Sequence, residues 1–169
     1  MANNYLNFSL AVGLNNDGEK EWCREGLEFL QELLYGNIDP DEPANDKEKE
    51  LCSVFESFLS DETGCGLEFE WSIDRENDKD ELWIHADESG SPDQVAKFLQ
   101  AFLVKFRPEE GMWFSWSYTC SKMRVNEFGG GACAITAKEM EFFDPDRLAQ
   151  EYLEKGGLSR KETNLWTKQ

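Results

Sequence analysis

The sequence predicts an α+β domain in which helices cover one face of an antiparallel sheet. Two kinds of pattern support this prediction. Several segments alternate apolar and polar residues with a period of two, as half-buried strands do. Others place apolar residues three and four positions apart, as amphipathic helices do. With 169 residues, 40% of them hydrophobic, the chain is long enough to bury the core of one domain.

The first strand and two helices are expected before residue 60. Tyr5–Leu14 alternates apolar and polar residues and predicts a strand. Asn16 or Asp17 can cap a helix over about Glu19–Tyr35. The acidic, proline-containing stretch NIDPDEPAND indicates an exposed loop. A second amphipathic helix is expected at about Asp46–Leu59.

A hairpin and a third helix are expected in the middle of the chain. Leu67–Ile73 alternates cleanly, and the run DRENDKDE links it to a second strand at Leu82–Asp87. The run SPDQ at 91–94 predicts a helix start, with Ser as N-cap, Pro at the first helical position and Gln completing a capping box. An apolar stripe at helical spacing continues this helix until just before Pro108.

The last third predicts two strands and a helix. Met112–Cys120 is a strand, and the loop SKMRVNEFGGG returns to a strand at Ala132–Lys138. A final helix runs from Asp144-Pro145 to about Lys155. With the acidic second helix set aside as an insertion, the order begins β-α-β-β-α-β, which is ferredoxin-like, followed by an extra C-terminal strand and helix. We expect residues 1–157 to form one domain and 158–169 a flexible tail.

Negative charge is concentrated in one part of the chain. The formal net charge is −18, and residues 37–94 contribute −15 of it, with 19 Asp and Glu against 4 Lys and Arg. Residues 1–36 contribute −4 and residues 95–169 contribute +1. This balance argues against direct binding to nucleic acid or to an anionic membrane, since both need clustered Lys and Arg. The candidate partner surface is the acidic first hairpin: Glu68, Glu70, Asp74, Glu76, Asp78, Asp80 and Glu81.

The cysteines indicate a reducing compartment, and the lack of long apolar runs argues against a membrane span. Five cysteines, an odd number, lie at scattered positions. They favour free thiols in a reducing cytoplasm over a disulfide framework. No apolar run reaches 15 residues, so we expect neither a signal peptide nor a membrane span.

Catalytic and metal chemistry have weak support in the sequence. His85, the only histidine, could pair with Cys120 or Cys133 as a nucleophile and base, although a structural role is favoured. The DRENDKDE run alternates carboxylates, but Lys79 and His85 stand where an EF-hand loop requires Gly and Glu. We therefore expect no metal and no cofactor. Four strand tryptophans, at positions 71, 83, 113 and 116, are expected mainly in the core, with a ligand groove as the alternative.

The loop Ser121–Gly131 is the second candidate site. Its glycines are not followed by Lys-Ser/Thr, so they do not form a phosphate-binding loop. They allow a positive φ, a bulge or close packing at the start of the last strand. Basic residues outnumber acidic ones here, so an anion or an acidic partner could dock. The candidate residues are Ser121, Lys122, Arg124, Gly129, Gly130 and Gly131.

The segments ESGSPDQVAKFLQAFLVKF and TCSKMRVNEFGGGACAIT resemble a family of small bacterial and mobile-element proteins. The shared core is Cys-Ser-Lys-x-Arg-x-x-Glu-Phe-Gly-Gly-Gly-Ala. The similarity covers less than a third of the chain, and the resemblance implies no activity and no catalytic residue. It implies a shared loop feature: Ser121, Lys122, Arg124, Glu127 and Gly129–Gly131.

These patterns favour a non-enzymatic interaction protein whose acidic half binds a basic surface of another protein. One such protein is a phage- or plasmid-encoded inhibitor that imitates nucleic-acid charge and blocks a host defence or regulatory protein. The alternatives are a small-ligand or anion-binding protein, or an enzyme, using Ser121–Gly131 with His85 and Cys120. Acidity that serves only solubility is the remaining explanation. A homodimer is compatible with the aromatic content.

Overall fold

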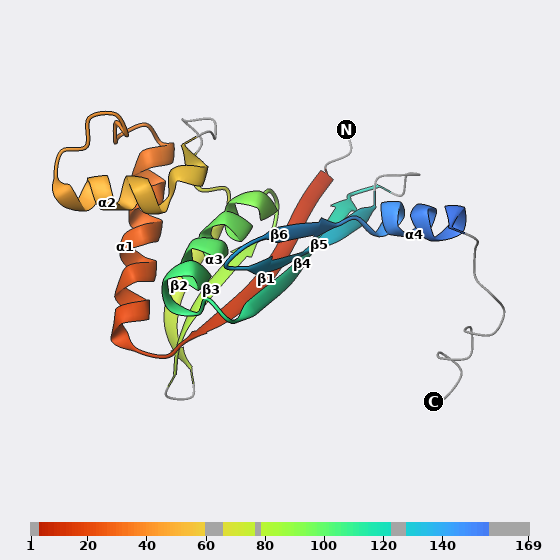
Figure 1. The fold of residues 1–169 in the computed structure, drawn as a ribbon. Helices are drawn as coiled ribbons and strands as arrows, with labels where there is room; N and C mark the ends of the chain where they lie inside the picture. The colour runs from red at the N-terminus through yellow and green to blue at the C-terminus, as the bar shows by residue number, and fades with distance from the viewer. Residues whose placement is uncertain (1–3, 60–65, 77–78, 123–127, 156–169) are drawn as a thin grey trace.

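The computed structural model describes residues 4–59, 66–76, 79–122 and 128–155. Within these ranges, six antiparallel strands form one sheet in the order β2-β3-β1-β4-β5-β6 (Figure 1). The strands are β1 (Asn4–Leu14), β2 (Glu70–Glu76), β3 (Lys79–Ala86), β4 (Gly111–Cys120), β5 (Gly129–Thr136) and β6 (Met140–Phe143).

The described helices connect these strands in the predicted way. They are α1 (Asp17–Leu34), α2 (Asp46–Val54), a 3₁₀ turn (Glu56–Phe58), α3 (Pro92–Phe106) and α4 (Pro145–Glu154). Helix α1 follows β1 and precedes the β2-β3 hairpin, and α3 joins β3 to β4. Together with the strand order β2-β3-β1-β4, this is the predicted ferredoxin-like connectivity, so the fold class is confirmed. The acidic α2 lies across α1, away from the sheet (Figure 1).

Helices α1 and α3 meet the same face of the sheet and enclose an aromatic core. Trp22 of α1 lies 5.7 Å from Phe98 and 5.6 Å from Phe106 of α3, measured between ring centroids. Phe55, at the end of α2, lies 5.6 Å from Trp22 and closes the same cluster. A large apolar side chain contributes about 1.5–3 kcal/mol when fully buried. The predicted α3 stripe is confirmed in its buried residues: Val95, Phe98, Leu99, Phe102 and Leu103.

The start of α3 confirms one half of the predicted capping box. The Gln94 amide donates to Ser91 Oγ at 3.2 Å, so Ser91 is the N-cap. The Gln94 side chain does not complete the box. Instead, its Oε1 accepts a hydrogen bond from the Glu68 amide at 2.9 Å and ties the approach to β2 to the start of α3.

The extra C-terminal part has two strands, so the prediction of a single extra strand was wrong. The last predicted strand was expected to continue to Lys138, but β5 ends at Thr136. The Thr136 hydroxyl accepts hydrogen bonds from the Lys138 and Glu139 amides at 3.2 and 3.1 Å and forms a tight turn. Strand β6 follows this turn with only four residues, too few for an alternating pattern to stand out.

The second predicted helix is also shorter than expected. It ends at Val54, and Phe55 lies between it and the 3₁₀ turn that carries the buried Phe58. Phe55 and Phe58 meet edge to face at 6.0 Å. The break therefore turns both rings into the core.

A buried ion pair joins the start of α1 to the end of α3. Glu19 is 3% exposed, and Arg107 Nη2 lies 2.6 Å from Glu19 Oε2. The same Arg107 nitrogen donates to the Gly13 carbonyl oxygen at 2.7 Å, and the Asn15 amide donates to Glu19 at 2.8 Å. Burial alone raises the pKa of Glu19, but the hydrogen bonds from Arg107 and Asn15 and the guanidinium charge outweigh it. The pKa of this carboxyl is therefore lowered from 4.5.

Replacing Glu19 by Gln should lower the free energy of unfolding by about 3 kcal/mol at neutral pH, because it leaves the Arg107 charge buried without its partner. A lowered folded pKa stabilises the fold above the unfolded pKa and loses this effect as pH falls through the folded value. The stability difference between wild type and E19Q, measured by urea denaturation, should therefore shrink between pH 7 and about pH 2.

Glu21→Gln is the matched control, since Glu21 lies in the same helix and forms an exposed pair with Arg24. It should change stability by less than about 0.5 kcal/mol at either pH. A wild-type advantage over E19Q that is the same at both pH values would contradict the assignment.

Candidate functional site

The face of the sheet away from α1 and α3 carries an acidic and aromatic patch. Strand pairing aligns its residues in three rows across β1, β3 and β2, because directly paired residues point to the same face. We call these residues the open-face patch. The rows are Ser9, His85 and Glu70; Ala11, Trp83 and Ser72; and Gly13, Glu81 and Asp74.

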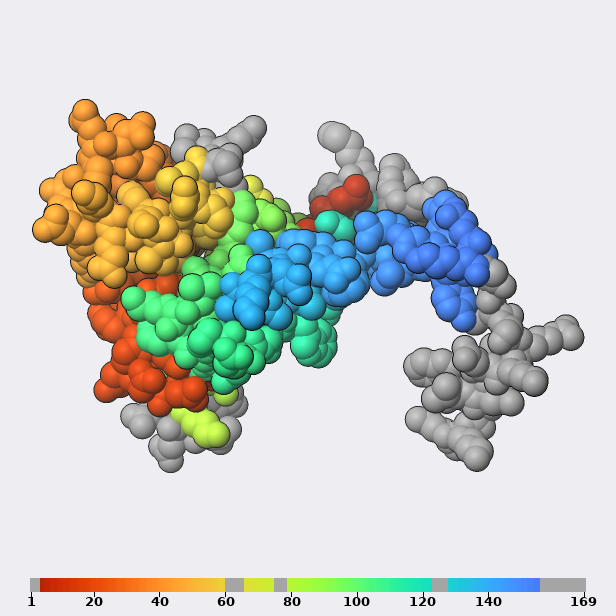
Figure 2. All heavy atoms as spheres, viewed as in Figure 1, coloured from red at the N-terminus to blue at the C-terminus, as the bar shows by residue number. Residues whose placement is uncertain are grey.

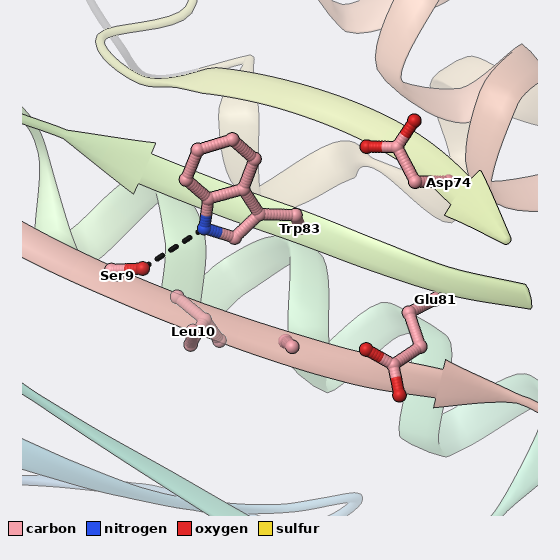
Figure 3. A pocket seen from close by; sticks show the side chains of 6 residues that line it. Ser9, Leu10, Asp74, Glu81 and Trp83 are labelled. Carbon is pink, nitrogen blue, oxygen red and sulfur yellow. Dashed lines mark hydrogen bonds between the residues drawn. The ribbon is translucent and has the colours of Figure 1, made fainter. Parts of the chain in front are cut away.

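Trp83 is the centre of the open-face patch and is fixed from two sides. Its indole Nε1 donates to Ser9 Oγ at 2.9 Å (Figure 3). Its ring stacks on His85 with a centroid distance of 3.9 Å and an interplanar angle of 28°. His85 Nε2 lies 3.8 Å from Glu70 Oε2. Trp83 is nevertheless 42% exposed, so a rigidly oriented indole is presented to solvent.

A hollow of about 370 Å³ lies beside Trp83. Its lining comes from three neighbouring strands: Ser9, Leu10, Ala11, Asp74, Glu81 and Trp83 (Figure 3). Asp74 and Glu81 are directly opposite each other on β2 and β3. Like charges in that position repel, so a cation that enters the hollow relieves the repulsion. Asp74 accepts a hydrogen bond from Ser72 at 2.6 Å, and among the described residues Glu81 has no ion-pair partner.

The predicted acidic surface is divided by the structure. Glu70, Asp74 and Glu81 lie on the open face, and the exposed Glu68 immediately precedes β2. Asp80 lies on the other side of β3, where its carboxylate pairs with Lys20 of α1 at 2.8 Å, so it does not belong to this surface. The backbone of residue 76 pairs with that of residue 79, and residue 78 is outside the described ranges.

Other exposed carboxylates, in residues 1–36 as well as in 37–94, lie on the helical layer. Glu28 and Glu32 are exposed on α1, and Asp46 and Glu50 are exposed on α2. Negative charge therefore occupies both layers of this half of the molecule. The open-face patch differs from these helix surfaces because it combines carboxylates with an exposed aromatic ring and a hollow.

The second candidate region lies between β4 and β5 and includes the first three residues of β5. Ser121 and Lys122 are exposed beyond the end of β4, Arg124 and Glu127 fall outside the described residues, and Gly129–Gly131 open strand β5. Positive φ values among described glycines occur only at positions 36 and 66, so the run does not serve a left-handed turn.

Close packing explains the glycines instead. A Cβ at Gly131 would lie 2.6 Å from Trp116 Cε2 and 3.0 Å from the Phe143 carbonyl oxygen. A Cβ at Gly130 would lie 3.3 Å from Ser117 Cα. Of the three roles expected for this run, the structure supports close packing between β4, β5 and β6.

The alternative catalytic pair is not assembled. Ser9 of β1 pairs with His85, whereas Asn4 of β1 pairs with Cys120. Five residues of extended strand, about 17 Å, therefore separate the two positions. Cys133 is fully buried on the core face, and burial raises the pKa of its thiol to about 11. Neither cysteine can act with His85 in this arrangement.

Two of the four strand tryptophans depart from the core expectation. Trp83 is exposed in the patch, and Trp113 of β4 is 75% exposed. Trp71 and Trp116 are partly buried against the core, as expected. Ser9, Leu10 and Ala11 of β1 line the hollow and were not expected to belong to a site. Only Ser9 and Ala11 leave a sequence signal, and it is weak: small residues at alternate positions of a strand that lies beside a tryptophan.

In the described ranges, no three His, Cys, Asp or Glu side chains are grouped so that they could hold a metal ion. None of the helices described is long and apolar enough to cross a membrane. No protein-family profile, curated protein or solved structure matches the chain.

Replacing Gly131 by Ala should lower the free energy of unfolding by about 1–3 kcal/mol, since the added methyl group collides with the Trp116 ring and the β6 backbone. Gly129→Ala is the matched control, because its Cβ would meet only Tyr118 Cδ2 at 3.9 Å, an ordinary contact. Chemical denaturation measures both variants. Equal stability of the two would contradict the packing role.

Alkylation should distinguish structural from reactive thiols. Burial raises the pKa of Cys23 to about 12, with a further rise from Glu19 and a partial offset from Arg107. Native protein treated with iodoacetamide at pH 8 should therefore leave Cys23 and Cys133 unlabelled, and urea should expose both. Peptide mass spectrometry reads the labelled positions. Rapid native labelling of Cys133 would reopen the nucleophile hypothesis.

Proposed function

We propose that this protein is a non-enzymatic interaction protein that binds a basic segment of another protein at the open-face patch. The observation that carries the proposal is the exposed Trp83 ring, fixed by Ser9 and His85 beside the hollow that Asp74 and Glu81 line. A guanidinium or ammonium group in this hollow meets an aromatic face and two carboxylates. Because the indole is already oriented, little side-chain entropy is lost on binding.

The charge distribution supports a protein partner. Residues 37–94 carry 15 of the 18 net negative charges, so this half of the molecule repels phosphates and attracts cationic surfaces. Long-range attraction increases the rate of encounter, whereas the fixed indole and its carboxylates determine which cationic side chain docks.

We further propose that the partner's basic surface otherwise binds nucleic acid. This chain would block that surface by presenting negative charges as the phosphates of nucleic acid do. The net charge of −15 on residues 37–94 supports this competition with nucleic acid. The spread of carboxylates over two layers favours recognition through the open-face patch over a continuous strip that follows a phosphate backbone. A competing nucleic acid should then lower the amount of partner captured.

Trp83→Ala should weaken binding of a short arginine-glycine peptide about five- to tenfold, since one cation–π contact contributes about 1 kcal/mol or more when partly desolvated. Trp113→Ala is the matched control, because it removes a more exposed tryptophan from β4. Isothermal titration calorimetry at low salt measures the affinity, which should fall as salt screens the charges.

A second pair of variants distinguishes an effect of total net charge from an effect of the assigned site. Glu81→Gln and Glu50→Gln change the charge equally, but only Glu81 lines the hollow. Glu81→Gln should weaken the peptide several-fold more than Glu50→Gln. Equal losses in the two, or equal losses in the two tryptophan variants, would show that binding follows total charge and would refute the assigned site.

A further inference from the structure

Strand β2 forms the longer of the two edges of the sheet. In the described part of the chain it pairs with β3 alone, over the seven residues Glu70–Glu76. The strand at the opposite edge, β6, has four residues. Alternate residues of an antiparallel edge strand direct their amide and carbonyl groups away from the sheet. Because very short edge strands discourage further pairing, β2 is the edge that can accept another strand.

The packing and the sequence of β2 leave its edge suited to pairing. Helix α1 packs on β1 and β3, and α3 packs on β4 and β5, so these helices cover a face of the sheet. Figure 2 shows the molecule from the side of these helices. The seven residues of β2 include no proline and no lysine, two residue types that block pairing at edge strands. Its charged residues instead restrict which strand can be added.

Charge on β2 disfavours a second copy and favours a basic strand. The residues of β2 in the open-face patch are Glu70, Ser72 and Asp74, and the Glu70 side chain is 80% exposed. If two copies of β2 paired antiparallel about Ser72, Glu70 of each would lie opposite Asp74 of the other, and like charges in that position repel. A strand with Lys or Arg at the same two positions forms opposite-charge pairs. Arg75, the basic residue of β2, occupies a position of the other face.

We propose that the basic segment recognised at the open-face patch binds in an extended form, as an additional strand on β2. Its basic residues lie four positions apart, one opposite Glu70 and the other opposite Asp74. Backbone hydrogen bonds to β2 supply affinity that is independent of sequence, and the two carboxylates select the spacing of the basic residues. This inference rests on the proposed function and specifies how the partner binds.

The additional strand also brings a basic side chain to the hollow beside Trp83. Neighbouring strands lie about 4.8 Å apart, so a residue opposite Asp74 is one strand away from Asp74 and two strands, about 10 Å, away from Glu81. These are the two carboxylates that line the hollow. The long side chain of an arginine or lysine at that position extends over Asp74 toward the indole ring, with its charged group leading.

N-methylation of a peptide at alternate residues tests this binding mode. The probe is a nine-residue peptide with arginine at its third and seventh positions, serine at its fifth, and threonine or valine elsewhere. Only every second amide of an added strand faces β2. Methylating one alternate set of amides should therefore weaken binding to the full chain at least about tenfold, and methylating the other set less than about twofold, as measured by isothermal titration calorimetry. The matched control is a peptide of equal composition whose arginines are three positions apart, on opposite faces of a strand. It should bind several-fold more weakly.

Amide hydrogen exchange, followed by NMR on the full chain, locates the added strand. With the peptide bound, alternate amides of β2 should exchange at least about tenfold more slowly, whereas the amides of β6, at the other edge, should be unchanged. Equal losses from both methylated sets, or no alternating protection on β2, would overturn the added strand. The proposed function would still stand if binding depended on Trp83. If no arginine peptide binds in a Trp83-dependent way, both the proposed function and this inference are refuted.

Discussion

The packing of Trp22 between α1 and α3 is the contact on which the rest of the arrangement depends. Both helices must lie on one side of the sheet for this ring of α1 to meet α3, whose three phenylalanines surround it at centroid distances of 5.6–6.1 Å. Each strand in the acidic half therefore buries one set of alternate residues and exposes the other. The Glu19–Arg107 pair closes the same corner, where β1, α1 and α3 meet. The open face is a consequence of this one-sided packing.

Local patterns in the sequence predicted most of the helices and strands. The site was harder to predict because its contacts join residues that are far apart in the sequence. Trp83 was expected in the core, but it lies on the open face of β3, opposite the buried Leu82 and Ile84. Strand β6 was missed because four residues carry too little periodicity. The contact of Trp83 with Ser9 depends on the register of β1 against β3, 74 residues apart along the chain. The pairing of Asp80 with Lys20 spans 60 residues, so no local pattern could show that Asp80 does not belong to the acidic surface.

The open-face patch and the core follow opposite energetic rules. In the core, the carboxylate of Glu19 is matched by the Arg107 guanidinium and accepts a hydrogen bond from the Asn15 amide, so its charge stabilises the fold. In the patch, Asp74 and Glu81 face each other across two strands. This arrangement reduces stability and increases the local negative potential. Unmatched charge beside a fixed aromatic ring supports the proposed binding of a cationic group.

Strand β1 joins the two parts of the sheet. Its first residues, Asn4–Asn7, pair with β4, whereas Phe8–Leu14 pair with β3. Among the described strands it is the one hydrogen-bonded to both the acidic β2-β3 hairpin and the β4-β5-β6 part. Ser9, Leu10 and Ala11, which lie just past this change of partner, line the hollow beside Trp83. The residues that form the floor of the hollow therefore lie where the acidic hairpin is joined to the rest of the sheet.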